Sequence, residues 1–167
     1  GFRLIDERTY IVEPRAQTPV YIHEMVLDPV GAKGEEFAVR APLVEQGILA
    51  VWQTDAESDG LNQLVLQAGL AWQDIGILRA LVRYLKQVGV TWGRAYLTQV
   101  LNLHPDVARS LVTLFHATLD TGFAGNRDRS ASEARQAIEA ALQATQSLDE
   151  DRIIRRLLNL VDAAVRT

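Results

Sequence analysis

The stretch SLDEDRIIRRLLNLVDAAVRT, residues 147–167, carries the clearest helical signal in the sequence. Ser147 is a favourable N-cap residue, and Glu150 three positions later completes a capping box. Asp149, Glu150 and Asp151 place negative charge in the first turn, where the helix dipole favours it. These signals predict a long helix that starts at the cap Ser147.

Apolar residues recur at the helical period along this stretch, which indicates that one face of the helix is buried. The stripe consists of Ile154, Leu157, Leu158, Val161, Ala164 and Val165. Two acid-before-base pairs, Asp151 with Arg155 and Asp162 with Arg166, add about 0.2–0.5 kcal/mol each. Because no Gly, Pro or cap precedes Thr167, the helix is expected to run to that residue and the natural chain to continue beyond it.

Six segments upstream also carry the helical period, so the chain is predicted to be mainly α, a multi-helix bundle. The seven expected helices span residues 35–54, 61–69, 72–88, 92–103, 105–119, 131–146 and 147–167. Thr91 is expected to cap the fourth helix, and Ser130 with Glu133 forms a second capping box before the sixth. Pro105 suits a first helical position, and Gly89 suits a left-handed helix end.

Two of these segments carry more detailed expectations. In the helix over 72–88 the expected core stripe is Ile75, Leu78, Leu81, Val82 and Leu85, while Arg79, Arg83 and Lys86 are expected to face solvent. Pro42 marks either a first helical position or a kink within 35–54. The loop over 120–129 is expected to be flexible.

The N-terminal segment is rich in β-branched and aromatic residues and predicts two antiparallel strands, at 2–12 and 19–27. A polar loop with two prolines, residues 13–19, separates them, and a turn is expected over 28–34. A two-stranded hairpin is marginal alone, so it is expected to pack on helices or on strands outside this sequence. Its open edge invites pairing with a second copy.

Composition narrows the class of protein. The chain has 167 residues, of which 48% are hydrophobic, so it is long enough to bury a stable core without disulfides or bound metal ions. It contains no cysteine, which excludes disulfides and thiolate chemistry and fits the cytoplasm. A net charge of −4 argues against nucleic acid, and no apolar run approaches the ~18 residues of a membrane span.

Four stretches of the sequence resemble the large bacterial NAD-specific glutamate dehydrogenases. They are LNQLVLQAGLAWQD, ILRALVRYLKQVG, AYLTQVLNLHPDVA and DEDRIIRRLLNLVDAAVRT. The resemblance is specific across 43–119 and 147–167, looser in 1–42 and weak in 120–146. It implies that residues 1–34 form a β-hairpin at the end of an ACT-like module. Residues 35–167 would then be a helical domain leading into a catalytic domain that this sequence lacks.

The resemblance also carries an implied function. The whole enzyme would convert L-glutamate, NAD and water to 2-oxoglutarate, ammonia and NADH, and this segment would be a non-catalytic structural or regulatory part. Its partners would be the catalytic and ACT-like domains of its own chain, in a homo-oligomer. The alternative is a stand-alone α-helical interaction or ligand-binding module. An independent small enzyme is disfavoured because no catalytic constellation is present.

Residue patterns assign no catalytic, cofactor-binding or metal-binding residue to the segment itself. No G-x-G-x-x-G motif occurs, and the glycines at 31, 34, 122 and 125 have the spacing of turn residues. The acidic residues at 149–151 point apart on a helix, so a charged first turn is preferred over a metal site. The histidines at 23, 104 and 116 are single and scattered.

The remaining candidates are contact residues. A solvated mixed-charge face is preferred for Arg155 and Arg156, and the resemblance adds the hypothesis that both meet acidic groups of the catalytic domain. Trp52 and Trp72 stand at predicted helix ends, as does Trp92, so core packing or an interdomain contact is preferred over a ligand cage.

Overall fold

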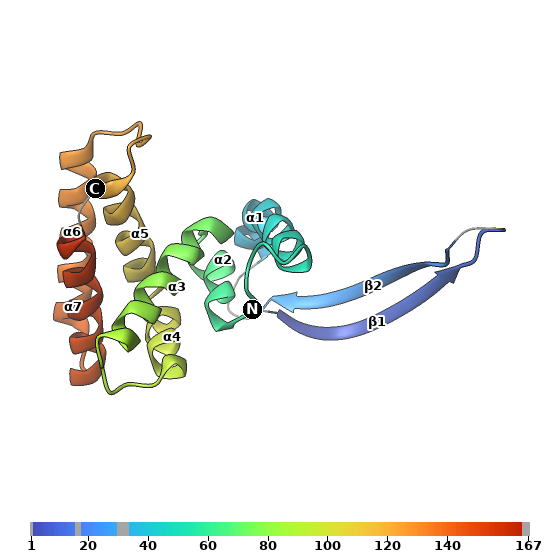
Figure 1. Cartoon of the computed structure of the whole chain (residues 1–167), viewed down its shortest axis with the longest axis horizontal. Coiled ribbons are helices and arrows are strands. Elements are labelled where there is room, and N and C mark those ends of the chain that lie inside the picture. Colours follow the sequence, from blue (N-terminus) through green and yellow to red (C-terminus); the bar gives the residue numbers. More distant parts are fainter. Residues whose placement is uncertain (1, 16–17, 30–33, 165–167) are drawn as a thin grey trace.

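The computed structural model describes residues 2–15, 18–29 and 34–164, which form a helical body with a long hairpin extending from one side (Figure 1). The hairpin consists of β1 (Phe2–Val12) and β2 (Val20–Pro29). The helices are α1 (Gly34–Trp52), the 3-10 helix η1 (Gly60–Gln63), α2 (Leu64–Gln67), α3 (Trp72–Gln87), α4 (Arg94–Leu103), α5 (Pro105–Leu119), α6 (Arg127–Ala144) and α7 (Leu148–Ala163). The prediction of a mainly helical chain with an N-terminal antiparallel hairpin is confirmed. The division of the chain at residue 34 stays a prediction, as does the ACT-like origin of the hairpin.

The two strands pair in register from Phe2 opposite Pro29 to Val12 opposite Val20. The register shifts by one residue at Ile5, an irregularity of the β-bulge type that locally strengthens the twist. Among the described residues, the hairpin meets the body near its base (Figure 1), where the Phe2 ring packs edge to face against Phe37 of α1 with centroids 6.1 Å apart. Residues 30–33 of the turn expected over 28–34 lie outside the described residues.

The helical body is organised around α3, which contacts η1, α1, α2, α4, α5 and α7. The reason is its apolar stripe, which is buried as predicted at Ile75, Leu78, Val82 and Leu85 and half-buried at Leu81. Six further elements contribute fully buried side chains to the core, which include Leu61, Leu64, Leu97, Leu101, Leu111, Leu114, Ile138 and Ile153. No helix among the described residues combines the length and apolarity needed to cross a membrane.

Glycines follow the ends of two helices, and the sequence predicted this for Gly89. Gly89 has φ +84°, and the N–H groups of Gly89 and Val90 donate to the carbonyls of Lys86 (3.2 Å) and Leu85 (3.3 Å), which is a Schellman motif. Gly69 follows α2 with φ +64°. Both positions lie in the left-handed region that side chains with a Cβ disfavour. Pro105 is the first residue of α5, as predicted.

Two predicted helix starts are wrong. The fourth helix, α4, begins at Arg94 with Gly93 rather than Thr91 as its N-cap. The Lys86 ammonium donates to the Val90 and Trp92 carbonyls (2.9 and 2.8 Å) and holds that backbone outside the helix.

The second error concerns α6, which is capped by Asn126 instead of Ser130. The Asn126 side-chain oxygen accepts from the Arg129 N–H (3.0 Å), and Arg127 donates to the Ala117 carbonyl (3.0 Å). These bonds start the helix earlier, so the loop before it spans only 120–126. Flexibility of this loop stays a prediction.

The C-terminal helix α7 starts as predicted and ends earlier than predicted. The Ser147 hydroxyl accepts from the Glu150 N–H (3.4 Å), but the Glu150 carboxylate lies 2.8 Å from His104 Nε2 and does not complete the capping box. The helix ends at Ala163, and Ala164 has extended backbone and an exposed side chain. Residues 165–167 lie outside the described residues, and so does the predicted pair of Asp162 with Arg166. Asp162 forms an ion pair with Arg135 of α6 at 2.5 Å.

Candidate interdomain surface

Exposed apolar side chains are concentrated in the N-terminal third of the chain. Among the described residues, fifteen of the nineteen large hydrophobic side chains that are exposed lie between Leu4 and Trp52. We call these fifteen the N-terminal apolar surface: Leu4, Ile5, Tyr10, Ile11, Val12, Val20, Tyr21, Ile22, Met25, Val26, Leu27, Val39, Ile48, Leu49 and Trp52. Large exposed apolar surfaces are typical of sites that bind another protein, a membrane or a ligand.

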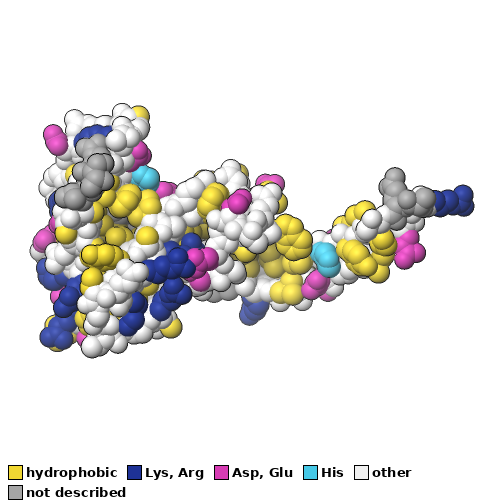
Figure 2. Space-filling view, viewed as in Figure 1, with side chains coloured by type: hydrophobic (Ala, Val, Ile, Leu, Met, Phe, Trp, Pro, Cys, Tyr) yellow, Lys and Arg dark blue, Asp and Glu magenta, His cyan; other side chains and the backbone are white. Residues whose placement is uncertain are grey.

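Along the hairpin the apolar residues form two groups on either side of a polar band (Figure 2). Charges in the band pair with one another. Arg8 lies 3.3 Å from Asp6, His23 lies 3.4 Å from Glu7, and the Tyr10 hydroxyl donates to Glu24 (3.1 Å). Thr9 and His23, directly opposite one another, hydrogen-bond at 3.0 Å. The band holds three carboxylates, those of Asp6, Glu7 and Glu24, against one guanidinium, that of Arg8, so it is acidic.

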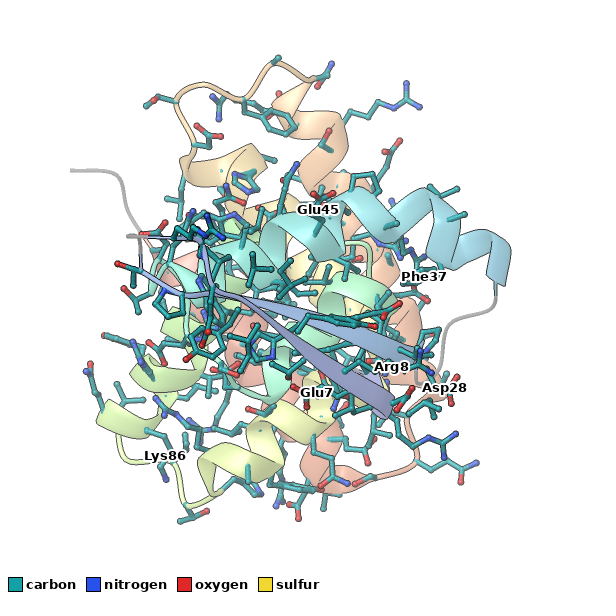
Figure 3. All side chains as sticks on the ribbon, turned by 90° about the vertical axis from the view of Figure 1, so that its right-hand side faces the viewer. Glu7, Arg8, Asp28, Phe37, Glu45 and Lys86 are labelled. Atoms are coloured by element: carbon teal, nitrogen blue, oxygen red, sulfur yellow. The ribbon has the colours of Figure 1, made fainter. Side chains whose placement is uncertain are left out.

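The apolar surface continues from the hairpin onto α1. Figure 3 views the molecule from the side of the hairpin and shows α1, with Phe37 and Glu45 labelled, beside the hairpin base. Val44 and Ala50 are buried against the body, whereas Ile48, Leu49 and Trp52 are exposed. A helix that is apolar on more than one side is usually covered on more than one side. Pro42 lies inside this helix, which excludes the first-position alternative.

An apolar groove of about 570 Å³ runs between α1 and the helical body. It brings together Trp52 and Trp72, two of the four predicted contact residues. Trp52 is 81% exposed, which excludes core packing for that residue, and Trp72 is half-buried. The other lining residues are Phe2, Val44, Gly47, Ile48, Val51, Ala56, Ser58, Asp59, Gly60, Asn62, Gln63, Val65 and Leu66.

One wall of the groove is fixed by a buried arginine that the sequence analysis placed in solvent. Arg79 of α3 is only 7% exposed and donates twice to Asp59, at 2.7 and 3.1 Å. It also donates to the Asn62 side-chain oxygen (3.1 Å) and to the Glu57 carbonyl (3.3 Å). Arg83, which is exposed as predicted, pairs with the Glu57 carboxylate. The expectation for Arg79 is wrong because the loop over 53–59 folds back over α3 and covers it.

Asp59 serves this arrangement in two ways. Its carboxylate binds Arg79 and also accepts from the Leu61 N–H (3.0 Å), which caps η1. Burial raises the pKa of Asp59, but the hydrogen bond and charge of Arg79, with the Leu61 N–H, outweigh it and hold that pKa below its ordinary value of 3.8. Asp59 is therefore ionised and fully engaged at neutral pH.

Arg155 and Arg156, the other two predicted contact residues, lie elsewhere. Both are exposed on α7, which packs against α3, α4 and α5 and has no prominent contact with α1. Arg155 binds Asp151 at 3.0 Å, as its spacing predicts, and this carboxylate raises the pKa of the Arg155 guanidinium. The structure thus separates the predicted contact residues into a tryptophan pair at α1 and α3 and an arginine pair on α7.

Two histidines hold helices together. His104 Nε2 lies 2.8 Å from Glu150 at the start of α7. His116 lies between Asp74 of α3 (2.8 Å) and Asp120 at the end of α5 (3.3 Å). Glu150 and Asp74 are 46 and 42 residues away from their histidines in the sequence, so local spacing does not predict these two contacts, whereas Asp120 follows His116 by four residues. Within the described ranges, no three His, Asp or Glu side chains converge as a metal site would require.

Comparison with known proteins places these features in a family. The family model described as glutamate dehydrogenase, helical motif 3, matches residues 56–121, from the loop that binds Arg79 to the end of α5. Over its whole length the chain is 37% identical to the NAD-specific glutamate dehydrogenase of Mycobacterium tuberculosis, covering 11% of that protein. It is 33% identical to the enzyme of the same name from Pseudomonas aeruginosa and 32% identical to that from Halomonas elongata, covering 10% of each.

The chain therefore spans about a tenth of the length of these relatives. The match to helical motif 3 begins just after α1 and ends just after α5, so it leaves out the N-terminal apolar surface and also α6 and α7. The chain therefore belongs to the NAD-specific glutamate dehydrogenase family and corresponds to a helical segment of its members.

Proposed function

We propose that this chain is a non-catalytic segment of an NAD-dependent glutamate dehydrogenase, and that its helical body holds the N-terminal apolar surface against other domains of the same enzyme. The whole enzyme would oxidise L-glutamate with NAD and water to 2-oxoglutarate, ammonia and NADH, with NAD bound outside this segment. The observation that carries the proposal is the concentration of exposed apolar side chains between Leu4 and Trp52 beside a closed helical core.

The charged side chains near the groove support a contact role over a chemical one. Among the described residues that line the groove, Asp59 alone is ionisable, and both of its oxygens already accept hydrogen bonds. Arg79 behind it is likewise engaged by Asp59 and Asn62. Such groups serve the architecture of the groove, because an acid–base catalyst needs an atom free to exchange a proton with a substrate.

A pair of matched substitutions in the parent enzyme tests the contact role. Ile48 on α1 and Val88 at the end of α3 are similarly exposed, at 52% and 54%, but only Ile48 belongs to the N-terminal apolar surface. We expect Ile48→Lys to lower specific activity several-fold or to disturb assembly, because it places a charge in an apolar contact. Val88→Lys should leave both unchanged. Equal behaviour of the two variants would contradict the proposal, provided that the isolated variant chains melt like the parent chain.

The non-catalytic part of the proposal is tested on the 167-residue chain alone. We expect no change in its tryptophan fluorescence on titration with NAD and no NADH formation from glutamate and NAD. Saturable NAD binding would contradict this part and would favour the alternative of an independent ligand-binding module.

A regulatory role follows from the resemblance to enzymes with ACT-like modules, which often bind amino acids. The central position of α3 between α1 and α7 suits a helix that relays a change from one side of the body to the other. We expect an amino-acid effector to alter hydrogen-exchange protection in residues 72–88 of the intact enzyme. If hydrogen exchange in residues 72–88 does not depend on the effector, the proposal that α3 relays a regulatory change loses its support.

A further inference from the structure

The distal end of the hairpin carries an apolar cluster for which the described residues offer no cover. We propose that this tip cluster, formed by Tyr10, Ile11, Val12, Val20, Tyr21 and Ile22, inserts between two layers of the remaining parent polypeptide within the same subunit. The proposal names the partner of one part of the N-terminal apolar surface, and it rests on the proposed function.

The tip cluster is apolar on both faces of the hairpin. Its members form three consecutive cross-strand pairs, Tyr10 with Ile22, Ile11 with Tyr21 and Val12 with Val20. Successive pairs in an antiparallel ladder point to opposite faces, so neither face is polar. Every member is between 46% and 59% exposed. Strands that are apolar on both faces are characteristic of sheets covered on both sides, whereas a one-sided cover leaves a polar outer face.

The body of the chain does not supply this cover. In Figure 1 the hairpin extends away from the helices, and its distal end is the part furthest from them. The aromatic contact between hairpin and body is at Phe2, at the opposite end of β1. The two layers therefore come from outside the described residues.

The charges of the hairpin disfavour an anionic partner as the cover. The tip cluster itself carries no charged side chain, the polar band beside it holds three carboxylates (Asp6, Glu7 and Glu24) against the one guanidinium of Arg8, and the loop beyond it carries Glu13 and Arg15, which are of opposite sign. A nucleic acid or an anionic lipid surface would require a concentration of basic groups. An apolar protein interior satisfies the cluster without them.

The parent polypeptide itself is the cover that fits best. A lone two-stranded hairpin is marginally stable in water, so the tip requires a permanent partner rather than a transient one. Permanent interfaces are also the more hydrophobic ones. The relatives are about nine to ten times as long as this chain, which provides ample polypeptide in the same subunit.

Photo-crosslinking in the full-length enzyme tests the assignment. p-Benzoylphenylalanine replaces Tyr21 in the tip cluster and, as a matched control in the polar band of the same hairpin, Thr9. We expect efficient crosslinking from position 21, at the mass of one subunit on a denaturing gel, to peptides outside residues 1–167. Crosslinking from position 9 should be several-fold weaker.

Two results would overturn the proposal. A crosslinked band at twice the subunit mass would show that a second copy covers the tip, and equal yields at positions 21 and 9 would show that nothing covers it. Hydrogen exchange gives an independent reading, since amides in 10–12 and 20–22 should be protected in the full enzyme and exchange rapidly in the 167-residue chain. If Ile48→Lys impairs the enzyme while the tip stays uncovered, only this inference fails and the proposed contact role survives.

Discussion

Replacing Asp59 with asparagine is expected to destabilise the chain far more than a surface substitution does. The change keeps the size of the side chain and removes the negative charge that faces the Arg79 guanidinium at 2.7 Å. The Arg79 side chain is only 9% exposed, so water cannot replace the lost partner. Glu57 is the nearest remaining carboxylate, at 3.9 Å and half exposed, and it already binds Arg83.

The magnitude follows from this burial. Removing one partner of a buried ion pair typically costs about 3–5 kcal/mol, because a charge is left uncompensated. Asp59 is itself 32% exposed, and Asn62 and the Glu57 carbonyl still accept from Arg79, so we place the cost near the lower end, at about 3 kcal/mol. In a chain of this size that loss lowers the melting temperature by roughly 6–12 °C.

A double-mutant cycle measures the interaction. The single variants Asp59→Asn and Arg79→Met and the double variant are unfolded in guanidinium chloride and followed by circular dichroism. We expect a coupling free energy of about 2 kcal/mol, because the two side chains share two hydrogen bonds in a largely dry site. Arg83→Met is the control: its pair with Glu57 is exposed, so it should cost at most about 1 kcal/mol. Additive single effects, or a loss for Asp59→Asn no larger than that for Arg83→Met, would refute the reasoning.

The other predictions concern the same chain and its parent. Because the pKa of Asp59 is lowered on folding, the ionised carboxylate stabilises the folded chain fully above about pH 4, and this stabilisation is lost as the pH falls through the folded-state pKa. The difference in free energy of unfolding between the parent chain and Asp59→Asn should therefore shrink from pH 7 to pH 3. A difference that stays constant with pH in denaturant melts would contradict this. Gly89→Ala should destabilise the chain by about 1 kcal/mol because Gly89 has φ +84°. Gly76→Ala inside α3, where an added Cβ meets nothing within 4 Å, should stabilise the chain by about 0.5–1 kcal/mol. Thermal melts that reverse this order would refute the prediction. Joint charge reversal of Arg155 and Arg156 in the full enzyme should weaken activity or assembly while the isolated chain still folds, and unchanged assembly and kinetics would count against a contact with the catalytic domain.

Local sequence determined the elements because the forces that form them act over a few residues. The stripe from Ile75 to Leu85 places α3 in the core without knowledge of any neighbour. Ser147 caps α7 and Gly89 ends α3 through hydrogen bonds within one turn. The β-branched and aromatic residues of the N-terminal segment likewise predict β1 and β2 as antiparallel strands. The resemblance in the helical motifs predicted the family that the comparisons then found.

Tertiary structure decided every feature that joins residues far apart in the sequence. Arg79 follows Ile75 by four positions and therefore falls beside the buried stripe, but only the folded loop supplies the carboxylate that lets a charge remain there. The starts of α4 and α6 differ from the predicted ones because Lys86 binds the Trp92 carbonyl before α4 and Arg127 binds the Ala117 carbonyl of α5. The grouping of Trp52 with Trp72 in one groove, apart from Arg155 and Arg156, likewise depends on how the helices pack. Periodicity specifies which face of an element is apolar, whereas the position of that face relative to other elements is set by packing over the whole chain.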